Sequence, residues 1–152
     1  MTPDRKPRNS DVPYILLVED DDGDAKAITR AFAKAESVPQ IVRVTDGVEA
    51  LALLRSQSDL PSRRCIMLVD INMPRMNGLE CIRELRRDGL LDSAIVFVMS
   101  TSDDARDKIA AYKENIAGYI LKDRAGDNLR RVADLLVQYL CVVELPEFPA
   151  LE

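Results

Sequence analysis

The sequence of 152 residues contains no histidine. Without one, the chain cannot form a Ser-His-Asp or Cys-His nucleophile pair, cannot bind zinc through histidine, and cannot carry a phosphoryl group on a histidine of its own. Any chemistry in this protein must therefore come from carboxylates, hydroxyls, lysines and the backbone.

Cysteine is scarce and long apolar runs are absent. Cys65, Cys81 and Cys141 form no C-x-x-C pair and have no metal-type spacing, so we expect buried or free thiols in a reducing compartment. No apolar stretch approaches the roughly 18 residues that span a membrane, and residues 1–10 are polar, unlike a signal peptide. These absences predict a cytoplasmic protein that has no membrane partner.

Basic residues are fewer than acidic ones. The 21 lysines and arginines stand against 26 aspartates and glutamates, which gives a net charge of −5 and a pI near 4.9. Nucleic-acid-binding proteins normally present a basic face, so we expect no nucleic-acid partner. Arg83, Arg86 and Arg87 gather on one predicted helix, and we interpret them as an exposed helix face rather than a basic patch.

Five short apolar segments alternate with five segments of helical spacing. The apolar segments are residues 14–18, 41–44, 66–69, 95–99 and 118–121. Residues 14–18 are apolar throughout, which is typical of a strand buried on both faces of a parallel sheet, and the alternation of such short segments with helices makes βαβ units. We predict an α/β protein with a doubly wound (βα)5, flavodoxin-like fold and strand order 2-1-3-4-5. Asp22 and Asp24 are both suitable N-caps for the first helix.

The predicted domain covers most of the sequence. We expect a disordered lead over residues 1–12, one domain over residues 13–140 and an apolar extension over residues 141–152, which leaves no room for an output domain. The extension carries four large apolar residues, Val142, Val143, Leu145 and Phe148. Because exposed apolar residues tend to mark interfaces, we favour a homodimer contact over a tail that packs on its own domain. An exchange of tails between protomers is one form of such a contact.

Polar residues stand where the predicted strands end. The first strand is followed by Glu19, Asp20 and Asp21, the third by Asp70 and Asn72, the fourth by Ser100 and Thr101, and the fifth by Lys122. In doubly wound sheets, ligands bind at this edge, where the strand order reverses. The first and third strands are neighbours in the predicted order, so we expect their carboxylates to converge.

Converging carboxylates repel one another unless a cation lies between them. Mg²⁺ prefers such oxygen ligands and binds phosphate oxygens as well. A carboxylate can also attack a phosphoryl group and form an aspartyl phosphate. This reaction needs mainly positioning and charge neutralisation, which Mg²⁺, Lys122 and the hydroxyl of Ser100 can provide. The strand ends therefore indicate a phosphoryl-transfer site.

Four separated blocks of the sequence resemble the receiver domain of two-component response regulators. They are residues 18–21 (Val-Glu-Asp-Asp), residues 68–78 around Asp70, residues 99–101 (Met-Ser-Thr) and residues 118–122 (Gly-Tyr-Ile-Leu-Lys). The resemblance extends over about residues 13–140. It implies a protein that accepts a phosphoryl group from a sensor histidine kinase and removes it by self-dephosphorylation, without acting as an enzyme on other substrates.

The resemblance also implies roles for the residues around the phosphoryl group. Asp70 would be the phosphoacceptor, and Lys122 would bind the phosphoryl oxygens together with Ser100 and Thr101. Ser100 would also be the switch hydroxyl and Tyr119 the switch aromatic. In the family, this pair moves on phosphorylation and changes the face formed by the fourth helix, the fifth strand and the fifth helix.

A metal site is implied as well, with Mg²⁺ held by Glu19, Asp20, Asp70 and the backbone carbonyl of Asn72, and with Glu19 acting partly through water.

Two other functions are alternatives to phosphoryl acceptance from a kinase. An aspartyl-phosphate phosphatase of the haloacid-dehalogenase type would need an acid/base aspartate at position 72, where asparagine cannot transfer protons. A docking module that is never phosphorylated would not need the complete acidic set.

Two features depart from the common family pattern. Lys122 is followed by Asp123, where relatives commonly have proline after a cis peptide bond. A cis bond before any other residue costs about 2.5–4 kcal/mol, so we expect a different loop shape or a strained peptide. The tail of residues 141–152, together with this Lys-Asp pair, resembles the single-domain regulators paired with phytochrome-type histidine kinases.

Overall fold

The computed structural model of the protein describes residues 12–57, 59–73, 76–122 and 129–149. The predicted N-terminal lead lies outside the described residues except for Val12. The predicted distortion of the Lys122–Asp123 peptide also lies outside them, because Asp123 is not described. Within the described ranges, no helix has both the length and the apolar character that crossing a membrane requires.

Five strands form one parallel sheet in the order β2-β1-β3-β4-β5, as the sequence predicted. The strands are β1 (Tyr14–Val18), β2 (Ile41–Val44), β3 (Cys65–Val69), β4 (Ile95–Ser100) and β5 (Gly118–Leu121). The predicted segments differ from them by one residue at two places, because β3 begins at Cys65 and β4 ends at Ser100. The fold is therefore the predicted flavodoxin-like one.

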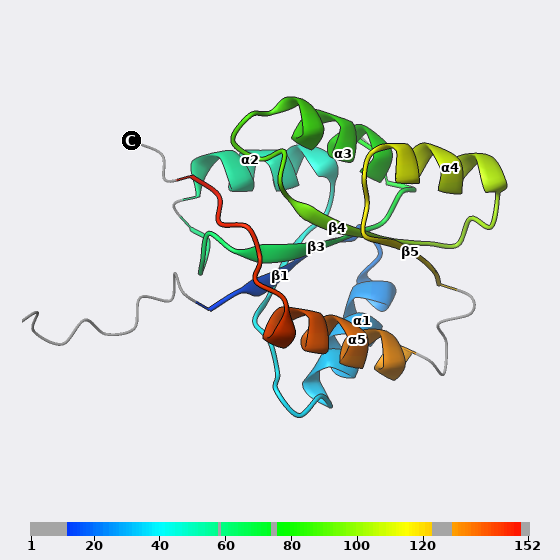
Figure 1. The fold of residues 1–152 in the computed structure, drawn as a ribbon. Helices are drawn as coiled ribbons and strands as arrows, with labels where there is room; N and C mark the ends of the chain where they lie inside the picture. The colour runs from blue at the N-terminus through cyan, green and yellow to red at the C-terminus, as the bar shows by residue number, and fades with distance from the viewer. Residues whose placement is uncertain (1–11, 58, 74–75, 123–128, 150–152) are drawn as a thin grey trace, which may run out of the picture.

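Five helices cover the two faces of the sheet (Figure 1). One layer contains α1 (Asp22–Ala33) and α5 (Leu129–Val142). The other contains α2 (Gly47–Ser56), α3 (Gly78–Arg87) and α4 (Ala105–Lys113). Because the strands are sandwiched between these layers, the central strands need apolar residues on both sides, which explains the uninterrupted apolar sequences of β1 and β3.

Strand β1 divides its side chains between the two layers. Tyr14, Leu16 and Val18 belong to the cluster shared with α2, α3 and α4, whereas Ile15 and Leu17 belong to the cluster shared with α1 and α5. None of the five is more than 2% exposed. Burial of each such side chain stabilises the fold by roughly 1.5–3 kcal/mol. This central strand therefore joins the two halves of the core.

The N-cap of α1 is Asp21, so the prediction of Asp22 or Asp24 was wrong. The Asp21 side chain accepts a hydrogen bond of 2.7 Å from the backbone N–H of Asp24, and its own backbone is extended. The helix thus begins one residue earlier than the predicted caps allow. Asp22 and Asp24 lie in the first turn, where the helix dipole favours negative charge.

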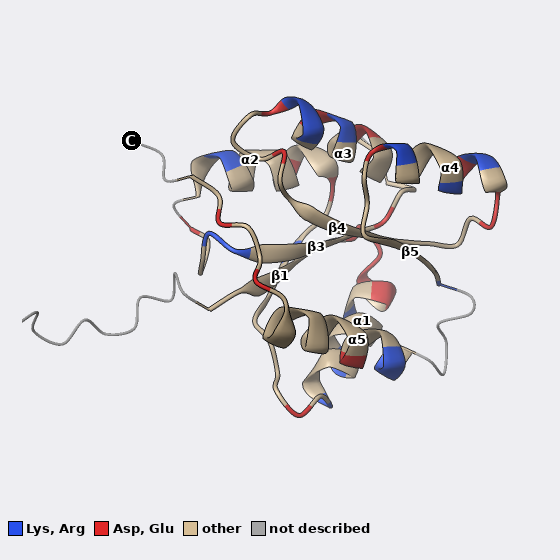
Figure 2. Ribbon diagram, in the orientation of Figure 1, with Lys and Arg blue, Asp and Glu red and all other residues tan. Residues whose placement is uncertain are grey.

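Arg86 lies half-buried under the end of α3, so the prediction of an exposed helix face was wrong for this residue. Its guanidinium donates four hydrogen bonds of 2.7–3.1 Å to backbone carbonyls of two loops; the acceptors are Asp92, Ala94, Glu114 and Asn115. Burial lowers the pKa of this guanidinium from its ordinary value. Arg83 and Arg87 are exposed, as expected, and Figure 2 shows basic residues along α3.

The C-terminal tail runs from the end of α5 across the sheet to the layer of α2 (Figure 1). Helix α5 ends at Val142, two residues beyond the predicted domain boundary at residue 140. Leu145 then packs in the cluster of α1 and α5, and Phe148 packs in the cluster of α2, α3 and α4. The two side chains are 6% and 2% exposed. The tail therefore contributes to the core on both sides of the sheet.

Candidate functional site

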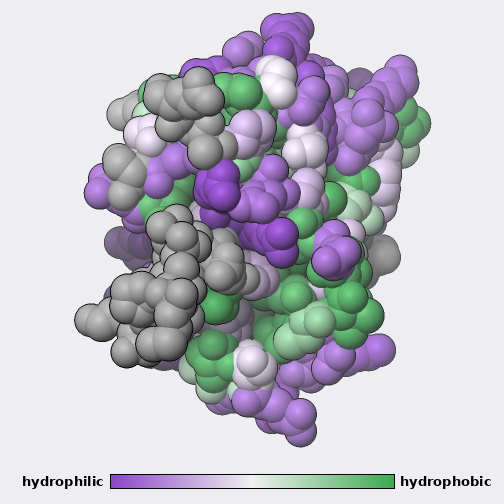
Figure 3. All heavy atoms as spheres, turned by 60° about the vertical axis from the view of Figure 1, so that its left-hand side comes forward, coloured by the Kyte–Doolittle hydropathy of each residue, from purple (hydrophilic) through white to green (hydrophobic). Residues whose placement is uncertain are grey.

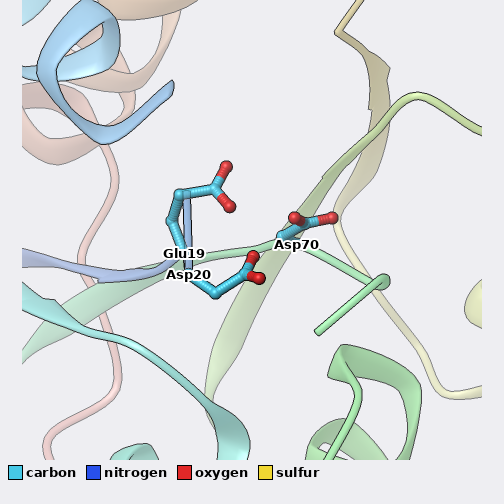
Figure 4. A group of neighbouring side chains, drawn as sticks. All are labelled: Glu19, Asp20 and Asp70. Atoms are coloured by element: carbon cyan, nitrogen blue, oxygen red, sulfur yellow. The ribbon is translucent and has the colours of Figure 1, made fainter. Parts of the chain in front are cut away.

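The carboxylates predicted at the strand ends lie together at one edge of the sheet. Val18 of β1 is the register partner of Val69 of β3, which brings Glu19 and Asp20 beside Asp70. One carboxylate oxygen from each of these three residues lies within 4.8 Å of the other two. Figure 4 shows the three side chains gathered around the same space. We call these three residues the acidic cluster.

The acidic cluster suits a divalent cation. Its three donors are carboxylate oxygens, which hard cations such as Mg²⁺ prefer. Glu19 and Asp70 are buried, at 1% and 7% exposed, whereas Asp20 is open to solvent and leaves a cation a path into the cluster. Burial raises the pKa of Glu19 to about 7, and the hydrogen bond from Lys122 opposes that rise. Three carboxylates this close favour a bound positive charge.

The loop after β3 holds Asp70 in place. The backbone N–H of Asp70 donates to the carbonyl of Val18 at 3.0 Å, and its Oδ1 accepts from the backbone N–H of Asn72 at 3.1 Å. Gly78 donates its N–H to the carbonyl of Ile71 at 3.0 Å, and a Cβ at Gly78 would lie 2.2 Å from the carbonyl oxygen of Asp70. Only glycine therefore allows the chain to return this close to Asp70.

Lys122 reaches the acidic cluster from the end of β5. Its backbone N–H donates to the carbonyl of Ser100 at 2.8 Å. Its Nζ lies 2.5 Å from Oε1 of Glu19 and 3.2 Å from Oδ2 of Asp70, and the side chain is only 13% exposed. Although burial by itself lowers the pKa of Lys122, hydrogen bonds to Asp24 and Glu19 raise it above its ordinary value. The ammonium group therefore stays charged.

Asp24 is a member of the site that its sequence pattern did not reveal, since it was interpreted only as a cap. Its Oδ2 lies 2.8 Å from Nζ of Lys122. Side chains in a helix tilt toward the helix N-terminus. A carboxylate in the first turn of α1 is therefore directed back toward the end of β1, where Glu19 and Asp20 lie. The position of Asp24 in this first turn was the sequence feature that could have identified it.

Arg43 is a second residue that the sequence analysis missed. Its Nε donates to the carbonyl of Glu19 at 3.0 Å, and a guanidinium NH₂ group donates to the carbonyl of Asp20 at 3.3 Å. The other NH₂ group pairs with Asp22 at 2.8 Å and lowers the pKa of that carboxyl. Arg43 thus fixes the backbone that presents the acidic cluster. A charged residue inside the otherwise apolar strand β2 was the signal for it.

The two predicted switch residues both contact Ser102, in the loop between β4 and α4. Ser100 is buried, and its Oγ accepts a hydrogen bond of 3.1 Å from the backbone N–H of Ser102. The phenol of Tyr119, which is half-buried, donates a hydrogen bond of 2.8 Å to the carbonyl of Ser102. Thr101, which lies between Ser100 and Ser102 in the sequence, is exposed. A movement of Ser100 would therefore disturb the loop that Tyr119 also holds.

Comparisons with known proteins agree on one family. A family model of the response regulator receiver domain matches residues 15–134. Response regulator Rcp1 from Synechocystis sp. is 29% identical over 135 residues, which are 87% of this chain and 92% of Rcp1. The structure of the phosphorylated cyanobacterial phytochrome response regulator RcpA superposes with a TM-score of 0.77 at 29% identity, covering 88% of this chain and 98% of RcpA. The Mn²⁺-bound form of Rcp1 gives a TM-score of 0.76 at 29% identity, with coverage of 88% and 98%.

Proposed function

This chain belongs to the response regulator receiver domain family, and we propose that it accepts a phosphoryl group from a sensor histidine kinase on Asp70. A response regulator is a signalling protein, so the chemistry takes place on its own side chain and not on an external substrate. One observation carries the proposal: the ammonium group of Lys122 lies 3.2 Å from the carboxylate of Asp70, inside a site with two further carboxylates.

The nucleophile is a carboxylate oxygen of Asp70. It forms a bond to the phosphorus of the phosphohistidine of the kinase, while the bond from phosphorus to the histidine nitrogen breaks and the electron pair stays on the imidazole, which takes up a proton. Lys122 donates hydrogen bonds to the phosphoryl oxygens and offsets their charge. The hydroxyls of Ser100 and Thr101 provide further donors.

The acidic cluster is the Mg²⁺ site in this proposal. Glu19, Asp20, Asp70 and the backbone carbonyl of Asn72 would hold the ion, with Glu19 acting partly through water. When bound, the ion would neutralise negative charge on the phosphoryl oxygens. The Mn²⁺-bound form of Rcp1 supports a divalent cation for this family.

Phosphorylation is read out through the Ser100–Ser102–Tyr119 contacts. When the hydroxyl of Ser100 turns to a phosphoryl oxygen, it gives up the hydrogen bond from Ser102 and loosens the loop held by Tyr119. The face of α4, β5 and α5 then changes and is recognised by a partner. Water attack on the aspartyl phosphate of Asp70, a self-dephosphorylation, returns the protein to its resting state.

The kinase partner is of the phytochrome type in this proposal. The support for this partner comes from RcpA, a cyanobacterial phytochrome response regulator. This chain covers 98% of RcpA at 29% identity. The chain also covers 92% of the response regulator Rcp1, so the likeness extends over nearly the whole of that relative. A reducing, cytoplasmic environment fits the free thiols of its cysteines.

A homodimer that forms through the tail is part of the proposal. Val142 and Val143 are 76% and 39% exposed, although Leu145 and Phe148 just after them are buried in their own domain. Figure 3 shows apolar surface on the side of the molecule that carries the tail. A groove of about 180 Å³ lies nearby between the end of α5 and the start of β2, lined in part by Val38. We expect a second copy of the chain to cover the exposed residues Val142, Val143 and Val38.

Phosphorylation by a small donor tests the function directly. The protein is incubated with Mg²⁺ and acetyl phosphate, and its intact mass is measured. We expect a gain of one phosphoryl group, no gain in Asp70→Asn, and no gain with EDTA. Failure of the wild type to gain mass, or an equal gain in Asp70→Asn, would overturn the proposal. Turnover of p-nitrophenyl phosphate would favour the phosphatase instead.

A further inference from the structure

We propose that Asp24 is a positioning residue for phosphoryl transfer: it binds Lys122 and holds its ammonium group where it can reach the phosphoryl group on Asp70. This inference rests on the proposed function of Asp70. It adds a residue of helix α1 to a site whose predicted members all stand on the strands or directly at their ends.

The three N–H donors of Lys122 are matched by three carboxylates. Its Nζ lies 2.5 Å from Glu19, 2.8 Å from Asp24 and 3.2 Å from Asp70. Glu19 and Asp70 belong to the acidic cluster, which in the described part of the chain consists of these two residues and Asp20. Asp24 does not belong to it. Asp24 is therefore a partner for the lysine that does not also serve as a metal ligand.

This difference matters as soon as a divalent cation occupies the acidic cluster. Glu19 and Asp70 would then be engaged as ligands, and the ammonium group of Lys122 would be repelled from the cluster by like charge. Asp24 is then the carboxylate that still attracts Lys122 toward the site. A free lysine side chain populates many rotamers, so an anchored ammonium group starts closer to its reactive position than a free one.

Asp24 is itself well placed to act as an anchor. Its backbone N–H donates to Oδ1 of the N-cap Asp21 at 2.7 Å, which fixes it in the first turn of α1. Asp24 and Lys122 line a small pocket of about 60 Å³, whose other walls are apolar side chains of α1, β4 and α5. The carboxylate of Asp24 is 47% exposed, whereas the side chain of Lys122, which lines the same pocket, is only 13% exposed. Less water at the contact strengthens the attraction between the two charges.

The test is a double-mutant cycle on the full chain, with the initial rate of phosphorylation by acetyl phosphate and Mg²⁺ as the readout. We expect Asp24→Ala to lower the rate about three- to tenfold, which is the effect of losing one hydrogen-bonded ion pair. Asp24→Asn keeps an acceptor oxygen and should fall between Asp24→Ala and the wild type. In a Lys122→Met background, Asp24→Ala should change the rate less than about twofold, because its partner is gone.

The matched control is Glu36→Ala, which removes an exposed carboxylate just beyond the C-terminal end of the same helix, away from the acidic cluster. We expect its rate to remain near that of the wild type. A wild-type rate in Asp24→Ala would overturn the inference, and so would an equal loss in the Lys122→Met background. If the wild type gains a phosphoryl group and Asp24→Ala behaves like it, only this inference fails. If the wild type gains none, the proposed function fails.

A second measurement detects the anchor without phosphorylation. In ¹⁵N-lysine-labelled protein, a hydrogen-bonded ammonium group exchanges its protons slowly enough to give a resolved signal. With Mg²⁺ present, we expect such a signal for Lys122, assigned by its loss in Lys122→Met. We expect it to weaken strongly in Asp24→Ala but to persist in Glu36→Ala. An unchanged Lys122 signal in Asp24→Ala would contradict the positioning role whatever the phosphorylation rates are.

Discussion

The backbone N–H of Phe148 donates a hydrogen bond of 2.9 Å to the carbonyl oxygen of Arg63, which fastens the C-terminal tail to the residues just before β3. Asp70 lies at the other end of the same strand. The tail is therefore held at the end of the sheet opposite the acidic cluster. The buried residues of the tail should contribute to the stability of the fold, and its exposed residues should contribute to dimer formation. Neither group should affect the phosphorylation of Asp70.

Phe148→Ala should destabilise the protein by about 3 kcal/mol or more, because a side chain only 2% exposed is removed from the core and leaves a cavity. Urea unfolding measures this loss. The matched control is Glu147→Gln, whose ion pairs with Arg63 and Arg64 lie at the surface and should contribute less than about 1 kcal/mol. A small effect of Phe148→Ala would show that the tail is not part of the folded core.

Replacing Val142 and Val143 together by serine should convert a dimer into a monomer without unfolding the domain. Both valines are exposed, so their removal costs little packing within one chain, whereas a second copy would lose its contact. Sedimentation equilibrium gives the mass and thermal unfolding checks the fold. The control is Val48→Ser in the first turn of α2, another exposed valine that is not part of the tail.

These point changes separate assembly from folding better than a chain cut after Leu140. Such a cut would also remove Leu145 and Phe148 from the core. Equal masses for the wild type and the Val142/Val143 double variant would contradict a dimer that forms through the tail.

Arg86→Lys should destabilise the protein by about 1–3 kcal/mol, although it preserves the charge. The planar guanidinium binds four carbonyl oxygens from two loops, and an ammonium group cannot serve that arrangement. Carbonyls that are half-buried and lose their donor carry a desolvation cost. Arg87→Lys, on the exposed side of the same helix, should change the free energy of unfolding by less than about 0.5 kcal/mol. Equal values for both variants, measured by urea unfolding, would refute this role.

Alkaline pH should weaken the fold through its buried thiols. Burial raises the pKa of Cys81 from 9.0 to about 12, and Cys65 behaves in the same way. In the unfolded chain the thiol loses its proton at the lower value, so the contribution of these groups to stability is complete below pH 9 and is lost as pH rises toward 12.

The free energy of unfolding should therefore fall between pH 8 and about pH 10.5, and it should fall less steeply in Cys81→Ala than in the wild type. Each protein is compared with its own value at pH 8, which removes the packing cost of the substitution. Cys141→Ala is the control, since Cys141 is exposed and its removal should leave the slope unchanged. An equal slope in Cys81→Ala and the wild type would contradict the predicted linkage.

The members of the acidic cluster were predictable from the sequence because their positions depend on short-range features. Glu19 and Asp70 follow directly after apolar strands, Asp20 follows Glu19, and the strands of a parallel sheet end at a common edge. Once β1 and β3 were expected to be neighbours, their carboxylates had to meet. Lys122 followed from the same logic, as the residue directly after β5.

What the sequence by itself determined was the strand–helix alternation, the parallel sheet and the residues at the strand ends, since burial on two faces leaves a local pattern of apolar residues. Only the tertiary structure decided which distant groups meet. Asp24 and Lys122 are 98 residues apart, and Arg86 finds its acceptors in two separate loops. Phe148 leaves its own helical layer and packs in the other. Such contacts depend on how whole helices, strands and loops pack against each other. The apolar pattern within one segment does not specify which other segment will lie against it.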